Sequence, residues 1–199
     1  PKGLNSDYIF TASPQGDPQI ITRTGTFVFK NKFVFQGYES IKEEKKSLEN
    51  LKTLNNRNYK ALIDSLNTVL VLSGGGHVYS HSKQGLKRLD KSVEQQNQFN
   101  AAVFIHDKNI YMYGGYGFWA FKEYLTVFDK STQQWEIMYL NSDYIPKGRW
   151  KPVFQIINDR LYVLGGRNNP DKSEQLGITR VVVAHTNPMC FKSKDAKAD

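Results

Sequence analysis

Aromatic side chains flanked by glycines make residues 115–121, GYGFWAF, the most unusual stretch of this chain. Tyr116, Phe118 and Trp119 are close neighbours in it, and aromatic rings can stack on sugar rings or grip a peptide. The stretch follows an apolar run that ends on Gly114, so we expect it in a loop at one end of a sheet, where binding residues gather. The alternative is a loop whose rings are buried over a neighbouring sheet.

Two arginines bracket a later pair of apolar runs. Arg149 and Trp150 precede these runs, and Arg167 follows them. Because the guanidinium group is a planar fork that matches a carboxylate, these residues are candidates for binding an acidic ligand. Ordinary surface ion pairs are the alternative.

Metal and redox chemistry find little support in the sequence. His77 and His81 are four residues apart, which puts them on one face of a strand, but a metal site needs a third ligand and none stands nearby. The one cysteine, Cys190, excludes an internal disulfide and a cysteine zinc cluster. We therefore expect no bound metal and no cofactor.

The common catalytic motifs are absent from the sequence. It contains no Gly-x-Ser-x-Gly, no Walker phosphate loop and no His-Glu-x-x-His. This favours a protein without catalytic residues, although it does not decide the question.

Short apolar runs separated by polar turns predict strands along most of the chain. We expect strands over residues 20–29, 33–35, 69–72, 78–79, 86–89, 101–105, 110–113, 124–128, 135–139, 153–157, 161–164 and 178–184. Residues 1–18 are predicted to form an irregular lead-in because Pro14, Gly16, Asp17 and Pro18 are turn residues. Residues 40–66 combine some helical leucine spacing with several asparagines that disfavour a helix, and residues 192–199 resemble a solvated tail.

A pair of apolar runs that ends on glycine recurs four times, at Gly37, Gly74, Gly114 and Gly165. A period of about 40 to 50 residues is typical of repeat architectures, and short strands at this period indicate propeller blades. The sequence therefore predicts an all-β fold of about four short antiparallel blades over residues 19–191.

The third repeat resembles the kelch motif. Its second strand ends in Gly114 and Gly115, the next strand ends in Phe128 and Asp129, and a polar turn leads to Trp135. The resemblance is strongest over about residues 100–166 and weaker before them. It implies a kelch-like β-propeller, in which the paired glycines make tight turns and the tryptophan covers a boundary between blades.

The kelch resemblance implies a non-enzymatic module that binds a protein or glycan through loops at one end of the blades. The expected binding residues are Tyr116, Phe118, Trp119, Arg149, Trp150 and Arg167. The alternative is a carbohydrate-active enzyme of mutarotase or lyase type, with an arginine-lined site near the propeller axis. Kelch propellers usually have more than four blades, so we expect a partial propeller, or one that further blades or a second chain complete.

Composition adds limits on partners. The chain has 199 residues and a net charge of +8, but its basic residues are scattered among acidic ones, so we expect solvated surface and no nucleic-acid partner. No apolar run approaches the roughly 20 residues of a membrane-spanning helix. Asparagine and lysine are abundant, as in bacterial proteins from AT-rich genomes, and a periplasmic or extracellular location is the expectation. The sequence leaves the ligand and the number of blades open.

Overall fold

The computed structural model describes residues 7–39, 54–56, 58–64, 67–74, 76–92, 97–138, 147–157, 160–168 and 182–185. Every regular element in these ranges is a β-strand, and all strand pairs are antiparallel. The prediction of an all-β fold is therefore confirmed. Over the same ranges there is no helix long and apolar enough to cross a membrane.

Four sheets follow one another along the chain. The first contains β1 (Ile9–Ala12), β2 (Pro18–Ile21), β3 (Gly25–Lys30) and β4 (Lys32–Gly37). The second contains β5 (Tyr59–Asp64), β6 (Asn67–Leu72), β7 (Val78–Ser82) and β8 (Gly85–Arg88). The third contains β9 (Ala102–His106), β10 (Asn109–Tyr113), β13 (Leu125–Asp129) and β14 (Gln134–Met138). The fourth contains β15 (Val153–Ile157), β16 (Arg160–Leu164) and β17 (Val182–His185), and a two-stranded hairpin, β11 (Tyr116–Gly117) and β12 (Ala120–Phe121), connects β10 to β13.

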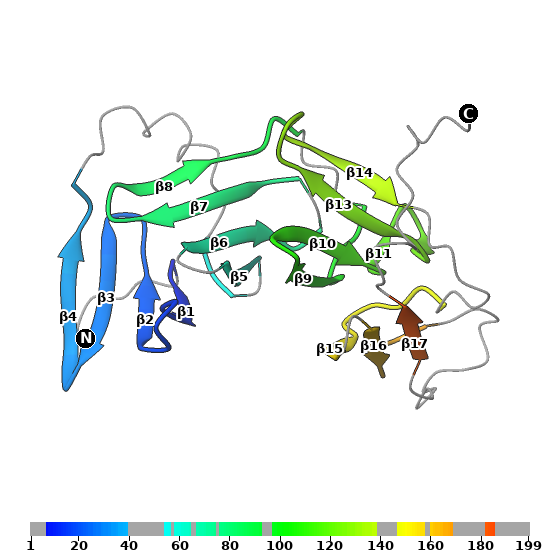
Figure 1. Ribbon diagram of the computed structural model, residues 1–199, viewed down its shortest axis with the longest axis horizontal. Coiled ribbons are helices and arrows are strands. Elements are labelled where there is room, and N and C mark those ends of the chain that lie inside the picture. Colours follow the sequence, from blue (N-terminus) through cyan, green and yellow to red (C-terminus); the bar gives the residue numbers. More distant parts are fainter. Residues whose placement is uncertain are drawn as a thin grey trace.

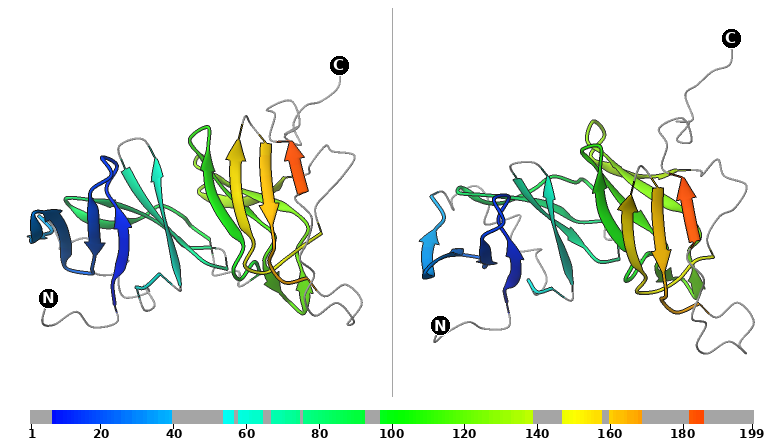
Figure 2. Two further views of the ribbon diagram at one scale, coloured as in Figure 1. Left: turned by 90° about the horizontal axis from the view of Figure 1, so that it is seen from below. Right: turned by 60° about the horizontal axis from the view of Figure 1, so that its bottom comes forward.

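The four sheets are arranged along an arc (Figure 1). Their first strands, β1, β5, β9 and β15, lie on the concave side of this arc, and their last strands lie on the convex side. Figure 2 shows the same sheets standing in a row, each packed against the next. The first and fourth sheets do not meet, so the described residues form an open, propeller-like arc and not a closed ring.

One apolar cluster fills each boundary between neighbouring sheets. The strand β9 shows how this arises from the sequence: Val103 packs toward the second sheet, whereas Ala102 and Phe104 pack toward the fourth. Because both faces of β9 are covered, its residues form a continuous apolar run and do not alternate with polar ones. The clusters at the three boundaries include Ile21 and Tyr79, Val71 and Trp135, and Tyr113 and Val163, respectively.

The position of the first repeat differs from the prediction. Gly74, Gly114 and Gly165 follow the second strands of their sheets, as the repeat requires, but Gly37 ends β4, the fourth strand of the first sheet. The alternating aromatics of residues 27–37 resemble an inner hairpin in sequence, although they form the outer hairpin β3–β4. The prediction was wrong here because the period-2 pattern marks a strand without saying where it lies in the sheet.

Two further expectations about the first sheet are corrected. Residues 9–12 form β1, so the predicted irregular lead-in does not extend over them. The sequence did not indicate this strand because it is only four residues long and the turn residues that follow it dominate the local pattern. A hydrogen bond of 2.7 Å from the Ser13 amide to the Asp17 carbonyl oxygen closes that turn. The single strand predicted over residues 20–29 is two strands, because the Thr22 hydroxyl donates to the Gly25 carbonyl at 2.7 Å and caps a turn between them.

Within the ambiguous stretch of residues 40–66, residues 59–64 form β5 and pair along their whole length with β6. Residues 59–64 are therefore not helical, whereas Leu48 and Leu51, which contribute to the helical leucine spacing, lie outside the described residues. Residues 40–53, residues 178–181 of the last predicted strand, Cys190 and the predicted tail over residues 192–199 lie outside the described residues.

Candidate functional site

The hairpin β11–β12 presents two large aromatic side chains to solvent. Phe118 and Trp119 form its two-residue turn, and their side chains are 73% and 93% exposed. Both residues have positive φ angles, 46° and 61°. A hairpin turn of this kind normally takes asparagine and glycine, because a side chain in the left-handed region costs roughly 1–2 kcal/mol per residue. The chain therefore holds two exposed aromatic rings in an unfavourable backbone conformation.

The base of this hairpin is firmly attached to the third sheet. Tyr116 and Phe99 exchange two backbone hydrogen bonds of 3.0 and 2.9 Å, and the Tyr116 and Phe121 rings pack with centroids 5.1 Å apart. A Cβ at Gly117 would lie 2.5 Å from the Asn97 carbonyl oxygen, so only glycine fits this close approach. The hairpin is thus a rigid support for its tip, and it projects from one end of the sheets (Figure 2).

Basic side chains accompany the aromatic ones. The Lys122 ammonium lies 5.9 Å from the centroid of the Phe118 ring, and the Lys151 ammonium lies 4.6 Å from the centroid of the Trp150 ring. Both separations fall in the range of cation–π contacts. The surface around the hairpin tip therefore combines aromatic faces with positive charge.

The structure brings the six predicted binding residues to the same end of the third and fourth sheets. Arg149 accepts a bond from the Gly115 amide at 2.9 Å through its carbonyl oxygen, which aligns residues 148–150 with the base of the hairpin. Trp150 and Arg167 exchange two backbone hydrogen bonds of 2.8 Å. The ring of Trp150 is partly covered, and Arg167 is exposed.

Arg149 differs from the other five residues because its side chain faces inward. It is 1% exposed, and its guanidinium group donates to the carbonyl oxygens of Lys147 and Gly165 at 3.0 Å each. These bonds hold two connections between strands in place. Arg149 therefore supports the loops and does not present its charge to a ligand.

Sequence reasoning missed three residues of this surface: Phe99, Lys122 and Lys151. Phe99 is 38% exposed and forms an isolated β-bridge with Tyr116. Trp150 forms the corresponding bridge with Arg167, so Phe99 and Trp150 occupy equivalent positions before the first strands of successive sheets. The signal for Phe99 was available, since an aromatic residue precedes each of these two inner strands by three positions. The lysines have no such signal.

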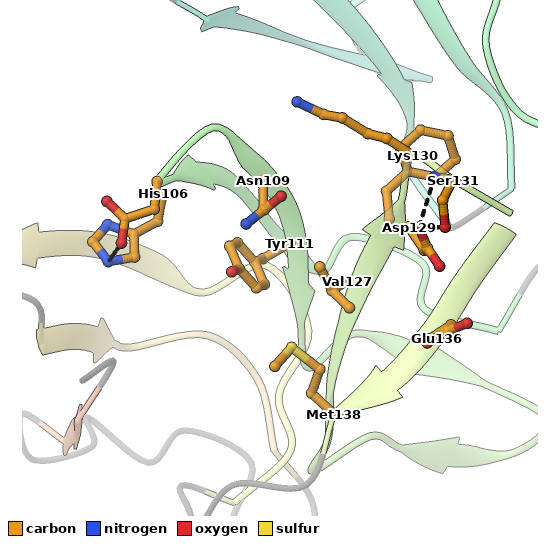
Figure 3. Close-up of a pocket in the computed structure, with 11 residues that line it drawn as sticks. His106, Asn109, Tyr111, Val127, Asp129, Lys130, Ser131, Glu136 and Met138 are labelled. Atoms are coloured by element: carbon orange, nitrogen blue, oxygen red, sulfur yellow. Dashed lines mark hydrogen bonds and ion pairs between the residues drawn. The ribbon is translucent and has the colours of Figure 1, made fainter. Parts of the chain in front are cut away.

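A separate pocket of about 580 Å³ lies at the opposite ends of the third sheet's strands (Figure 3). Its titratable groups do not converge. His106 lies 3.6 Å from Asp107 at one side, and at the other side Asp129 accepts bonds of 2.7 Å from the Ser131 amide and hydroxyl. These bonds hold the pKa of the Asp129 carboxyl below its usual range and mark it as a turn residue. Tyr111, Val127 and Met138 separate the two sides in Figure 3, so we do not assign chemistry to this pocket.

A polar cleft of about 750 Å³ lies between the first and second sheets. His81 lines it, and its Nε2 lies 2.8 Å from the Thr26 hydroxyl of the first sheet. Burial lowers the pKa of His81 to about 4, so the ring is neutral at pH 7. His77 packs edge to face on Tyr79. Among the described residues, no three potential ligand side chains gather into a metal site.

Comparison with known proteins adds no family to these observations. The chain matches no model of a known protein family and no curated protein sequence. The fold and the site thus define its class, which is an open, propeller-like arc of antiparallel sheets with an exposed aromatic hairpin.

Proposed function

We propose that this chain is a non-enzymatic, kelch-like propeller module that binds a protein or a glycan through the loops at one end of its blades. The observation that carries the proposal is Trp119, which is 93% exposed on a hairpin turn with a positive φ angle. Such local strain concentrates at functional sites, where the surrounding structure maintains it. Burial of one exposed aromatic side chain contributes about 2–3 kcal/mol to association.

The proposed binding surface comprises the hairpin tip and its neighbours. We define it by the residues Phe99, Tyr116, Phe118, Trp119, Lys122, Trp150, Lys151 and Arg167. Tryptophan, tyrosine and arginine are the residues that most often dominate binding energy at protein interfaces. The lysines and Arg167 would suit a ligand with acidic groups beside its apolar part.

The shape of this surface favours a protein partner over a glycan. Trp119 stands at the tip of a projecting hairpin, and neither described pocket includes it. A projecting ring inserts into a concave partner, whereas small ligands usually occupy a cavity of the protein that binds them. A protein with an apolar pocket rimmed by acidic residues fits this geometry best.

A display experiment with matched variants tests this proposal. Wild-type protein is screened against a displayed library of folded protein domains and against an array of defined oligosaccharides, beside Trp119→Ala and Ile137→Ala. Ile137 is 54% exposed on β14 and lies outside the proposed surface, so it controls for the loss of any exposed apolar side chain. We expect bound domains whose affinity falls at least tenfold with Trp119→Ala and is unchanged with Ile137→Ala.

Binding that survives Trp119→Ala, or the absence of binding to both kinds of ligand, would contradict the proposal. Binding to oligosaccharides alone would keep the site but assign it to a glycan. The alternative of an enzyme with an arginine near the axis gains no support from Arg149, whose guanidinium group is committed to two backbone carbonyls.

A further inference from the structure

At the two ends of the arc, no other described sheet packs on the outer face of the first or of the fourth sheet, and large apolar side chains are exposed on both faces. The first sheet packs on the second through Ile9, Ile21 and Thr26, so the alternate side chains point away from the arc. That outward face carries Phe10, Ile20, Phe27, Phe29, Phe33 and Phe35. Five of the twelve phenylalanines of the chain thus stand on one face of one sheet.

The rings on this face form an ordered layer. Phe27 and Phe35 pack with centroids 4.9 Å apart, and Phe29 and Phe33 pack at 5.2 Å. Phe10, Phe29 and Phe35 are 53%, 41% and 49% exposed. At about 200 Å² per phenylalanine, these three side chains expose about 300 Å² of apolar surface. This area is within the range of the largest apolar patch on a typical monomer, and such a patch is often a binding surface.

The opposite end of the arc carries an aliphatic face. Phe154, Ile156, Leu161 and Val163 pack toward the third sheet. The alternate side chains of β15, Val153 and Ile157, therefore point outward, and they are 66% and 50% exposed. Leu164 stands on the same outward face and is partly buried, and the exposed Gln155 and the partly buried Tyr162 lie between these aliphatic residues. We call this the aliphatic face after its exposed Val153 and Ile157.

We propose that two copies of this chain close a ring, with the phenylalanine face of each copy packed on the aliphatic face of the other. Both ends of the arc open toward the same side in Figure 1, so a copy turned by half a revolution about the axis of the arc would present its fourth sheet to the first sheet of its partner. The two joints would then be identical, as closed twofold symmetry requires. This inference is independent of the binding surface around Trp119.

The boundary between the third and fourth sheets shows that such a joint packs well. There the aromatic rings of Phe104 and Tyr111 meet the aliphatic side chains of Leu161 and Val163. The proposed joint combines the same kinds of side chain: the fourth sheet of one copy again supplies the aliphatic side chains, and the first sheet of the other copy supplies the aromatic rings. Over two joints, the three exposed phenylalanines alone would bury about 600 Å² of apolar surface, which is part of the roughly 1,600 Å² that a stable protein complex buries.

Light scattering coupled to size exclusion tests the ring. We expect twice the mass of one chain at micromolar concentration for the wild type. Phe35→Lys in the first sheet and Val153→Asp in the fourth should each weaken the dimer by roughly 30-fold or more, because each buries an unpaired charge in both joints. Ile137→Lys, which adds a charge at an exposed apolar position away from both faces, should leave the dimer intact.

Mixing the two face variants distinguishes the proposed ring from other dimers. In a mixed ring, one joint brings the lysine introduced in the first sheet of one copy to the aspartate introduced in the fourth sheet of the other, and the second joint is wild type. We therefore expect the mixture to dimerise although neither variant does so alone. Circular dichroism and urea unfolding of each variant show whether it is folded. A monomeric wild type, an open polymer, or a dimer that is sensitive to only one of the two faces would overturn the proposal.

Discussion

The side chains of Gln98 and Arg149 make equivalent hydrogen bonds in the third and fourth sheets. The Gln98 side chain donates to the Gly114 carbonyl oxygen at 3.1 Å, and the Arg149 guanidinium donates to the Gly165 carbonyl oxygen at 3.0 Å. Each bond joins the segment before an inner strand to the glycine pair after the second strand of the same sheet. Both side chains are buried, at 3% and 1% exposure.

This equivalence predicts how the site tolerates substitution. Arg149→Ala should lower the free energy of unfolding by about 2–3 kcal/mol, because it removes the charged donor from the carbonyl oxygens of Lys147 and Gly165. Arg149→Gln should cost less, since Gln98 shows that an amide can donate at this position. Urea unfolding measures both, with the exposed Arg167→Ala as the control. Equal losses for Ala and Gln would contradict the shared role.

Trp135 joins the third sheet to the second. It is 8% exposed, its indole nitrogen donates to the Gly76 carbonyl oxygen at 2.9 Å, and its ring packs on Phe128. Trp135→Ala should lower the free energy of unfolding by about 3–5 kcal/mol. Trp135→Phe keeps most of the packing and should cost clearly less. A loss below about 0.5 kcal/mol for the alanine variant, the range of ordinary surface changes, would remove this role.

Trp119 should behave in the opposite way. Because Trp119 adopts a φ of 61°, Trp119→Gly relieves strain, and we expect the free energy of unfolding to stay constant or rise by about 0.5 kcal/mol. The same variant should lose ligand binding. The wild-type Trp119 would then lower the stability of the fold in exchange for binding. Thermal unfolding of the free protein measures the first effect. A stability loss as large as that of Trp135→Ala would show that Trp119 is part of the core.

The buried ring of His81 predicts a pH dependence of stability. Its pKa is about 4 in the folded protein and about 6.5 in an unfolded chain, so the folded state binds fewer protons between these values. The stability that the neutral ring supplies is complete above about pH 6.5 and is lost as the pH falls through about 4.

His81→Gln isolates this contribution, since glutamine can still bond Thr26 but does not titrate. We expect the urea midpoint of the wild type to fall more steeply between pH 7 and pH 4 than that of the variant. The carboxyl groups titrate in both proteins, so only the difference between the two curves reports His81. Parallel curves would contradict the assigned pKa.

The sequence predicted the sheets well where each hairpin ends on a glycine pair. The strands β9, β10, β15 and β16 lie within a residue of the expected ranges, because their turns carry strong local signals. The first sheet was misplaced because β1 is only four residues long and because β3–β4 has the same alternation as an inner hairpin. Local patterns specify strands and turns, whereas the order of strands in a sheet depends on contacts far apart in the chain.

The candidate site was predicted by residue type but not by orientation. Trp119 was expected on a loop, and the structure shows how far it projects. The burial of Arg149 could not be foreseen, since its partners are backbone carbonyls, which no side-chain pattern reveals. For the same reason the likeness of Gln98 and Arg149 is invisible in the sequence, because an amide and a guanidinium share only their ability to donate.

The recurring bond of Gln98 and Arg149 makes the third and the fourth sheet, each with the segment that precedes it, two similar units. Because this hydrogen bond lies within one unit, duplication of a unit would lengthen the array without requiring sequence changes in the neighbouring units. Growth by copying changes only the two outermost surfaces and leaves every internal boundary as it was. A further unit at either end of the array would therefore leave the hairpin that bears Trp119 in its local setting.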